Sequence, residues 1–218
     1  MRRVSFMALF FCLAAAPAAA TDNDAEARAW RFRVFMDDTP IGYHRFELRD
    51  TGNRLRLESE ARFDVKFLFI TAYRYRHSNV ETWQDGCVRR LAAKTVTNGE
   101  TQVVTGAQQA EHFVVEQNGE QAMLPGCVMT FAYWNPAFLN ATRLLNPQTG
   151  EYLEVDITQL PEEPLDMRGE TQMARHFRIV ARGIELELWY SRDDRWLALE
   201  SATGDGRRLR YELISAET

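Results

Sequence analysis

The sequence has few cysteines, and it has no long apolar run after its first twenty residues. A helix needs about 20 consecutive apolar residues to cross a bilayer. We therefore expect no transmembrane segment once those first residues are removed.

Signatures of known catalytic sites are also missing. The sequence contains no G-x-S-x-G, H-E-x-x-H, Walker loop or dinucleotide fingerprint. Its four histidines are scattered singly, at His44, His77, His112 and His176. Most acids alternate with apolar residues, which is typical of a solvated sheet face rather than of a general acid–base pair. We predict no catalytic residues, no metal and no cofactor.

A block of basic residues is absent as well. The chain carries 26 Lys and Arg against 31 Asp and Glu, a net charge of −5. This acidic balance argues against nucleic acid as a partner, and against general adhesion to anionic lipid head groups.

The first twenty residues are typical of an export signal. Arg2 and Arg3 precede a short apolar run at 6–16, and the alanines at 18–20 fit the small-x-small pattern of a signal peptidase site. We predict a signal peptide over 1–20 and a single β-rich domain over 21–218. The predicted location is the periplasm, with the extracellular space as the alternative. Cys12 follows Phe11, so it does not fit a lipoprotein cleavage site.

The predicted mature chain keeps two cysteines, Cys87 and Cys127. Two cysteines in an exported chain usually pair. Such a disulfide closes a loop of about 41 residues, worth roughly 4 kcal/mol in the chain-entropy model. The competing interpretation is a redox or metal pair. No C-x-x-C or adjacent histidine favours it.

Strict alternation of apolar and charged residues dominates 54–67. The apolar set on one face is Leu55, Leu57, Ala61, Phe63, Val65 and Phe67. A period of two over this length indicates a long antiparallel strand with one wet face. Further strands are expected at 30–36, 41–49, 71–84, 88–97, 101–106, 111–117, 151–158, 174–182, 184–188, 196–203 and 208–213.

Turn residues separate these segments. The dipeptides Asp85-Gly86, Asn98-Gly99, Asn118-Gly119 and Asp205-Gly206 suit tight hairpins. Strands joined in this way pair as neighbours. The predicted fold is all-β, an antiparallel meander curved into a half-open barrel. Asn135-Pro136 predicts one short helix over about 136–145, and the prolines within 159–170 predict an exposed loop.

Large aromatic side chains are the candidate ligand-binding residues. A curved sheet with such side chains on its concave face can line an apolar cavity. The alternative is that they simply fill the core. The candidates are Phe63, Phe67, Tyr73, Tyr75, Trp83, Tyr133, Trp134 and Trp189.

One face of the segment from Tyr73 to Trp83 is unusually polar, because it also carries His77, Asn79 and Glu81. This composition favours a solvated edge strand. The alternative is the polar mouth of a cavity, where a neighbouring arginine (Arg74 or Arg76) meets a carboxylate or phosphate.

Several short motifs resemble a group of exported bacterial proteins known mainly as domains of unknown function. They are Trp30-x-Phe32-x-Val34-x-x-Asp37 followed by Ile41-Gly42, the stretch from Phe131 to Pro136, Leu144-Leu145-Asn146 before Gly150, and Leu188-Trp189-Tyr190. The resemblance implies a secreted antiparallel sheet, similar in fold to periplasmic carriers of lipids and lipoproteins. It brings no catalytic residues, and fold alone does not establish function.

Three functions fit this sequence. The first is a periplasmic binding or carrier protein for an apolar molecule, such as a lipid or acyl chain. The second is a structural or interaction protein of the cell envelope with a filled core and an envelope protein as partner. The third is a hydrolase or isomerase with an unrecognised site.

Overall fold

The computed structural model describes residues 27–67, 70–167, 169–204 and 206–217. The predicted signal peptide over 1–20 lies outside these residues. Within them, the chain forms one antiparallel sheet of 14 strands, in the order β8-β7-β6-β5-β4-β3-β2-β1-β14-β13-β12-β11-β10-β9. The all-β prediction is confirmed.

The first half of the sheet is a run of hairpins. Every strand pairs with the next one along the chain, as a meander requires. The strands are β1 (Ala27–Met36), β2 (Thr39–Asp50), β3 (Leu55–Phe67), β4 (Ile70–Gln84), β5 (Cys87–Thr97), β6 (Glu100–Gln109), β7 (His112–Gln117) and β8 (Glu120–Leu124).

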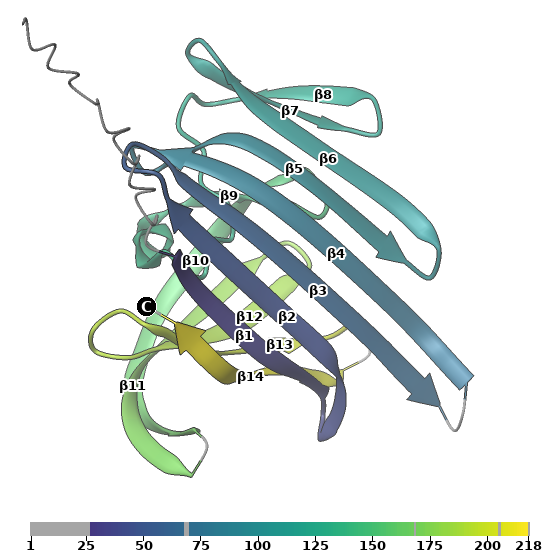
Figure 1. Ribbon diagram of the computed structural model, residues 1–218, viewed down its shortest axis with the longest axis vertical. Coiled ribbons are helices and arrows are strands. Elements are labelled where there is room, and N and C mark those ends of the chain that lie inside the picture. Colours follow the sequence, from purple (N-terminus) through teal and green to yellow (C-terminus); the bar gives the residue numbers. More distant parts are fainter. Residues whose placement is uncertain (1–26, 68–69, 168, 205, 218) are drawn as a thin grey trace, which may run out of the picture.

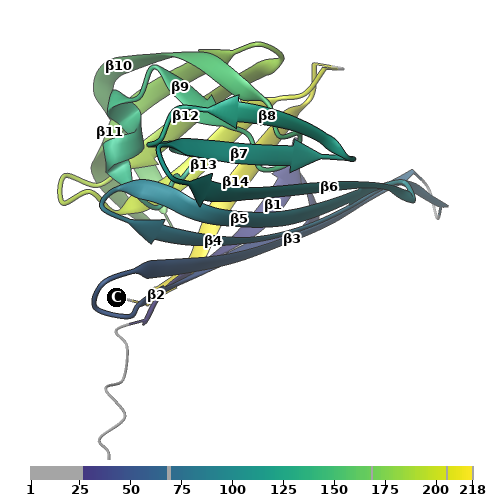
Figure 2. The ribbon, with the colours of Figure 1, turned by 90° about the horizontal axis from the view of Figure 1, so that it is seen from above.

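The second half repeats this pattern, but it does not continue from β8. Instead β14 pairs with β1, so the first and last strands are neighbours in the middle of the sheet. The strands are β9 (Arg143–Leu145), β10 (Tyr152–Met167), β11 (Glu170–Ala181), β12 (Ile184–Tyr190), β13 (Trp196–Ala202) and β14 (Arg208–Glu217). Figure 1 shows the long strands β1 to β5 side by side, and Figure 2 shows the sheet curling around a common interior.

The barrel stays open because its edge strands β8 and β9 do not pair. The connection between them, residues 125–142, lies across the gap instead. The amide of Val88 in β5 donates to Val128 (2.9 Å), and the amide of Leu145 in β9 donates to Met129 (2.8 Å). A half-open barrel is confirmed, with a loop rather than a strand pair spanning its opening.

The predicted hairpin chemistry is also confirmed at three turns. Asp85-Gly86, Asn98-Gly99 and Asn118-Gly119 all have positive φ at both residues, as type I′ turns require. Asp205 in the fourth dipeptide lies outside the described residues. Gly42 serves a different purpose, because a Cβ there would lie 1.8 Å from the carbonyl oxygen of Arg62 on β3.

The helix predicted over 136–145 is much shorter than expected. Asn135 caps a 3₁₀ helix over Pro136–Asn140, accepting a hydrogen bond from the Ala137 amide (3.2 Å). Ala141 then returns to extended backbone. The chain enters β9 and pairs with β10, so strand pairing limits the helix that the capping residues begin.

The loop predicted over 159–170 is wrong, since β10 runs through it to Met167 and forms a hairpin with β11. Its prolines are tolerated for two reasons. The register shifts between Leu160 and Glu163, and β9 covers only the first three residues of β10. In the described structure no strand pairs with the far edge of β10 around its prolines, where a missing amide costs no ladder hydrogen bond.

Burial follows the predicted alternation. On β3, Leu57, Ala61 and Phe63 are buried in the core, whereas Arg56 and Arg62 are exposed. The core occupies the concave side of the sheet and is covered by buried residues of the connecting segment, including Trp134 and Phe138. No helix in the described ranges has the length and apolarity needed to cross a membrane.

The predicted disulfide is present. Cys87 at the start of β5 is bonded to Cys127, with a Cα–Cα distance of 5.1 Å. The bridge therefore holds the start of the segment that covers the concave face.

Candidate functional site

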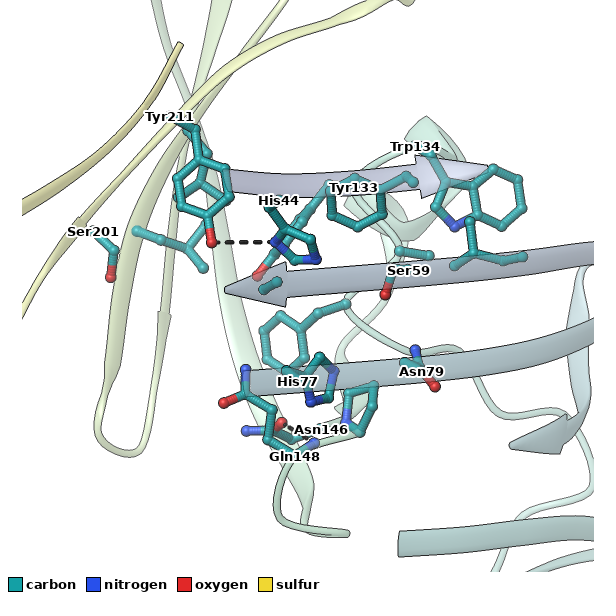
Figure 3. Close-up of a pocket in the computed structure, with 18 of the residues that line it drawn as sticks. His44, Ser59, His77, Asn79, Tyr133, Trp134, Asn146, Gln148, Ser201 and Tyr211 are labelled. Carbon is teal, nitrogen blue, oxygen red and sulfur yellow. Dashed lines mark hydrogen bonds between the residues drawn. The ribbon is translucent and has the colours of Figure 1, made fainter. Parts of the chain in front are cut away.

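An inner cavity of about 260 Å³ lies on the concave face of the sheet. Strands β2, β3 and β4 form its floor. Residues 131–134 of the connecting segment and residues 146–148, between β9 and β10, also line it. Side chains of β12, β13 and β14 complete the wall, among them Leu186, Leu199 and Tyr211. Figure 3 shows most of this lining, with His44, Ser59, His77 and Asn79 among the labelled polar residues.

An outer cavity of about 440 Å³ adjoins it. Its lining is largely apolar and includes Met36, Ile41, Phe63, Val65 and Tyr73. The two cavities share the lining residues Tyr75, Gln148, Leu209 and Tyr211. Small-molecule sites have volumes of roughly 300–1,000 Å³. The outer cavity alone is within this range, and so are the two cavities taken together.

Strand register gives the floor of the cavities a gradient of polarity. Across β3 and β4, Val65 pairs with Tyr73 and Phe63 with Tyr75 at the outer end. Further in, Ala61 pairs with His77, and Ser59 with Asn79. Because a strand rises about 3.3 Å per residue, the distance from Val65 to Ser59 is roughly 20 Å. The lining thus changes from apolar to polar over this distance.

Glu81 lies at the inner end and is only 1% exposed. Its carboxyl accepts hydrogen bonds from Asn79 Nδ2 (2.8 Å), Trp83 Nε1 (2.8 Å) and Thr130 Oγ1 (3.2 Å). No cation is paired with it in the part of the chain described. Burial raises the pKa of this carboxyl, and the three donors oppose that rise.

Two histidines face the inner cavity. His77 Nδ1 lies 2.9 Å from Thr95 Oγ1, and burial lowers the pKa of His77 to about 4. His44 Nδ1 lies 3.3 Å from the Tyr211 hydroxyl. Burial, together with the nearby His77, holds the pKa of His44 well below its usual value. Both rings are therefore uncharged near neutral pH.

Three buried polar atoms of this lining have no hydrogen-bond partner among the described protein groups. They are His44 Nε2, Asn79 Oδ1 and Trp134 Nε1. Buried polar atoms are nearly always hydrogen-bonded, because leaving one unpaired costs about 1–3 kcal/mol. Three such atoms make this cavity polar in part, with groups free to hydrogen-bond to a molecule placed inside it.

The same groups do not assemble a known catalytic arrangement. In the described structure Ser59, which lines the inner cavity, is hydrogen-bonded to neither histidine, and Thr95, the hydroxyl that does contact His77, is not part of the cavity lining. A nucleophile needs a base within hydrogen-bond reach. Within the same residues, no group of three or more His, Cys, Asp or Glu is placed to hold a metal ion.

The structure brings together most of the predicted ligand-binding residues. Phe63, Tyr73 and Tyr75 line the outer cavity, and Tyr133 and Trp134 line the inner one, which Tyr75 also borders. Burial raises the pKa of both Tyr75 and Tyr133, so their hydroxyls stay protonated.

The other three predicted residues are placed differently. Trp83 lines neither cavity, but packs edge-on against Trp134 with ring centroids 5.4 Å apart. Trp189 lies in a separate cluster with Ala174 and Leu197. The side chain of Phe67 lies outside the described residues.

The polar face of β4 is not a solvated edge, so the interpretation favoured from the sequence is wrong. β4 lies between β3 and β5, and His77, Asn79 and Glu81 are buried. The regular alternation from Tyr73 to Trp83 was the available signal, because it places the polar residues on the same face as the aromatics. The sequence reasoning missed His44 and Ser59, which need the β2–β3 and β3–β4 register to be found.

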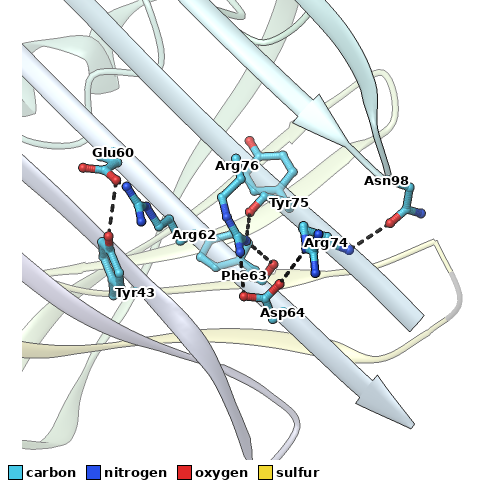
Figure 4. Close-up of polar contacts among 9 residues, drawn as sticks. All are labelled: Tyr43, Glu60, Arg62, Phe63, Asp64, Arg74, Tyr75, Arg76 and Asn98. Carbon is cyan, nitrogen blue, oxygen red and sulfur yellow. Dashed lines mark hydrogen bonds and ion pairs between the residues drawn. The ribbon is translucent and has the colours of Figure 1, made fainter. Parts of the chain in front are cut away.

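The arginines of β4 do not reach the cavity either, so the alternative of an arginine at its mouth is also corrected. Arg74 and Arg76 alternate with the inward residues and pair with Asp64 on the outer face, at 3.3 and 2.7 Å. Figure 4 shows these ion pairs. The hydrogen bond from Arg76 is the main reason that the pKa of Asp64 lies below its usual value.

Comparisons with known proteins agree with this fold. A crystal structure of a β-barrel-like protein of the domain of unknown function DUF1849, from Brucella abortus, superposes with a TM-score of 0.67 at 8% sequence identity. The match covers 88% of this chain and 98% of that one. At this identity it shows the fold alone. No curated protein matches the chain.

A match to a family model confirms the predicted resemblance to a domain of unknown function. The likeness to lipid carriers stays a prediction. The family model named "Domain of unknown function (DUF6134)" matches residues 32–214. The chain belongs to the DUF6134 family.

Proposed function

We propose that this protein is an exported, periplasmic binding or carrier protein for an apolar small molecule such as a lipid or acyl chain. The observation that carries the proposal is the pair of adjoining cavities on the concave face, the outer one lined mainly by apolar side chains. Each buried methylene of a ligand contributes about 0.8 kcal/mol, so a chain held in the outer cavity needs few polar contacts to bind.

Two further observations support this function over the alternatives. A filled core is the expectation for a purely structural envelope protein, and unfilled volume on the concave face speaks for a ligand instead. The Cys87–Cys127 disulfide supports an oxidising compartment. The hydrolase alternative draws no support from the hydrogen bonds of Ser59 and the histidines.

The experiment uses diphenylhexatriene, an uncharged probe that fluoresces in apolar surroundings. We expect the wild-type protein to bind it, and a lipid extract of the cell envelope to displace it. Met36→Trp places a larger side chain in the outer cavity and should weaken binding. Met173→Trp is the matched control, because Met173 is 44% exposed on β11 and lines neither cavity.

Native mass spectrometry of protein extracted from its own compartment gives an independent measurement. A bound mass in the lipid range, less abundant in Met36→Trp, is the expected result. A ligand-free protein that takes up neither the probe nor added lipid contradicts the proposal.

A further inference from the structure

Of the three unpartnered polar atoms that line the inner cavity, two are of fixed and opposite kind. Trp134 Nε1 can only donate a hydrogen bond, and Asn79 Oδ1 can only accept one. The orientation of the Asn79 amide is set by its Nδ2, which donates to Glu81 (2.8 Å). Asn79 is 5% exposed and Trp134 is 6% exposed, so bulk solvent does not satisfy these atoms.

Ser59 lies beside Asn79. It is the direct cross-strand partner of Asn79, it is buried, and it lines the same cavity. Its hydroxyl both donates and accepts. Figure 3 shows Ser59, Asn79 and Trp134 with their side chains around the inner cavity.

The charges of the residues that line this end of the cavity restrict which head groups can bind there. Among the described residues, its lining includes no lysine or arginine, and Glu81 supplies its one carboxyl. An anionic head group would therefore be buried without a counter-ion, which is costly. A cationic head group would leave the Trp134 N–H unpaired, and the Glu81 oxygens already accept three hydrogen bonds.

The opposite end of the cavities differs in charge. Arg207 is part of the lining of the outer cavity. A fatty acid bound in the reverse direction, with its carboxylate near this arginine and its tail inward, is the competing arrangement. It would leave the Asn79 and Trp134 atoms against hydrocarbon, which the proposed orientation avoids.

We propose that the inner cavity recognises the uncharged head group of an amphiphile, a hydroxyl or primary amide that accepts from Trp134 and donates to Asn79, while its apolar chain occupies the outer cavity. This inference rests on the proposed function and specifies its ligand class. These polar groups orient the ligand, because only its head group can form hydrogen bonds with them.

The test compares three probes with the same ten-carbon chain: decanol, decanoate and decylamine. Each probe is titrated at pH 7.5 into wild-type protein that holds diphenylhexatriene, and its displacement is measured. We expect decanol to do so at a concentration at least tenfold below the other two. Equal displacement by all three would mean that the polar end holds only water, and stronger displacement by decanoate would mean the reverse orientation. Either result overturns the inference.

Substitutions test which side chains cause the preference for decanol over decanoate. Trp134→Phe keeps a ring but removes the N–H, and should reduce the preference for decanol over decanoate about fivefold, as expected for one hydrogen bond. Trp189→Phe is the matched control, since Trp189 lines neither cavity, and it should keep the wild-type preference. If Trp134→Phe does not fold, Ser59→Ala replaces it, with a preference reduced about threefold. An unchanged preference in the folded variant contradicts the assignment.

The two proposals fail in different ways. If diphenylhexatriene does not bind the wild-type protein, the carrier function itself fails. If it binds and the three decyl probes displace it equally, the carrier function stands and the head-group recognition fails.

Discussion

Two tryptophan–glutamate pairs lie on opposite faces of this sheet and differ mainly in their access to water. In the inner pair, Trp83 Nε1 donates to Glu81 at 2.8 Å. In the outer pair, Trp189 Nε1 donates to Glu163 at 2.7 Å. Glu81 is 1% exposed, whereas the Glu163 side chain is 46% exposed. The same type of hydrogen bond thus occurs with a buried carboxyl in one pair and with a half-exposed carboxyl in the other.

The surroundings of the pairs follow from that difference. Glu81 depends on protein donors for both of its oxygens. Glu163 lies beside His176, which is stacked on Trp189 with ring centroids 4.5 Å apart and is also bonded to Glu187 (2.9 Å). Water can reach the half-exposed Glu163 carboxyl and replace a lost partner there, whereas bulk water does not reach Glu81. A buried polar group therefore costs far more to disturb.

The largest expected effect tests what holds the inner pair in place. The double variant Cys87→Ser/Cys127→Ser should lose about 4 kcal/mol of unfolding free energy by chain entropy, and its melting temperature should fall by several degrees. Thr130, a partner of Glu81, lies three residues from Cys127. We expect the Trp83 indole proton to exchange faster in this variant, and the Trp189 indole proton to exchange as in the wild type. Equal acceleration at both would show that the bridge does not act on the inner pair in particular.

The next effect compares the two glutamates directly. Glu81→Ala leaves three buried donors unpaired and should cost about 3 kcal/mol. Glu163→Ala exposes its former partners to water and should cost less than about 1 kcal/mol. Urea denaturation of both variants measures the difference. Losses of similar size would mean that burial does not distinguish the pairs.

The smallest expected effect is the pH dependence of stability that arises from the buried histidines of the inner cavity. The pKa of His77 is lowered to about 4, so the folded state favours the neutral ring. As the pH falls below about 6.5, the unfolded state binds the proton first and stability is lost. By pH 5 the loss from His77 is about 2 kcal/mol. His44 acts in the same direction, and Glu81 acts in the opposite one because its pKa is raised.

Melting temperatures at pH 7.5 and pH 5 check this expectation. In His77→Gln the decrease between the two pH values should be smaller than in the wild type, though not zero, since His44 still titrates. A variant with the wild-type decrease would show that protonation of His77 does not contribute.

Local patterns predicted most of the sheet, and their failures have physical causes. β8 (Glu120–Leu124) was missed because four of its five residues are exposed at an edge, so it has no apolar alternation. β9 was taken for helix because Asn135-Pro136 favours a helix start, although pairing with β10 ends it early. Pro161 and Pro164 indicated a loop, which is the usual meaning of prolines away from a free strand edge.

The candidate site was predicted in part for a similar reason. Aromatic side chains are recognisable by type, and Phe63, Tyr75 and Trp134 do line the cavities. His77, Asn79 and Glu81 were placed on the correct strand and face, but their polarity suggested water outside rather than a polar cavity inside. Residue type alone does not distinguish these two environments.

The sequence by itself determined the strands, the side of each strand that is apolar, and the hairpin neighbours, because alternation and turn conformation depend on residues close in the chain. Only the tertiary structure decided that β14 pairs with β1, that residues 125–142 cover the open side, and that Asn79 and Trp134 meet around one cavity. Those contacts join residues distant in the chain, and their free energy comes from shared burial that no local pattern records.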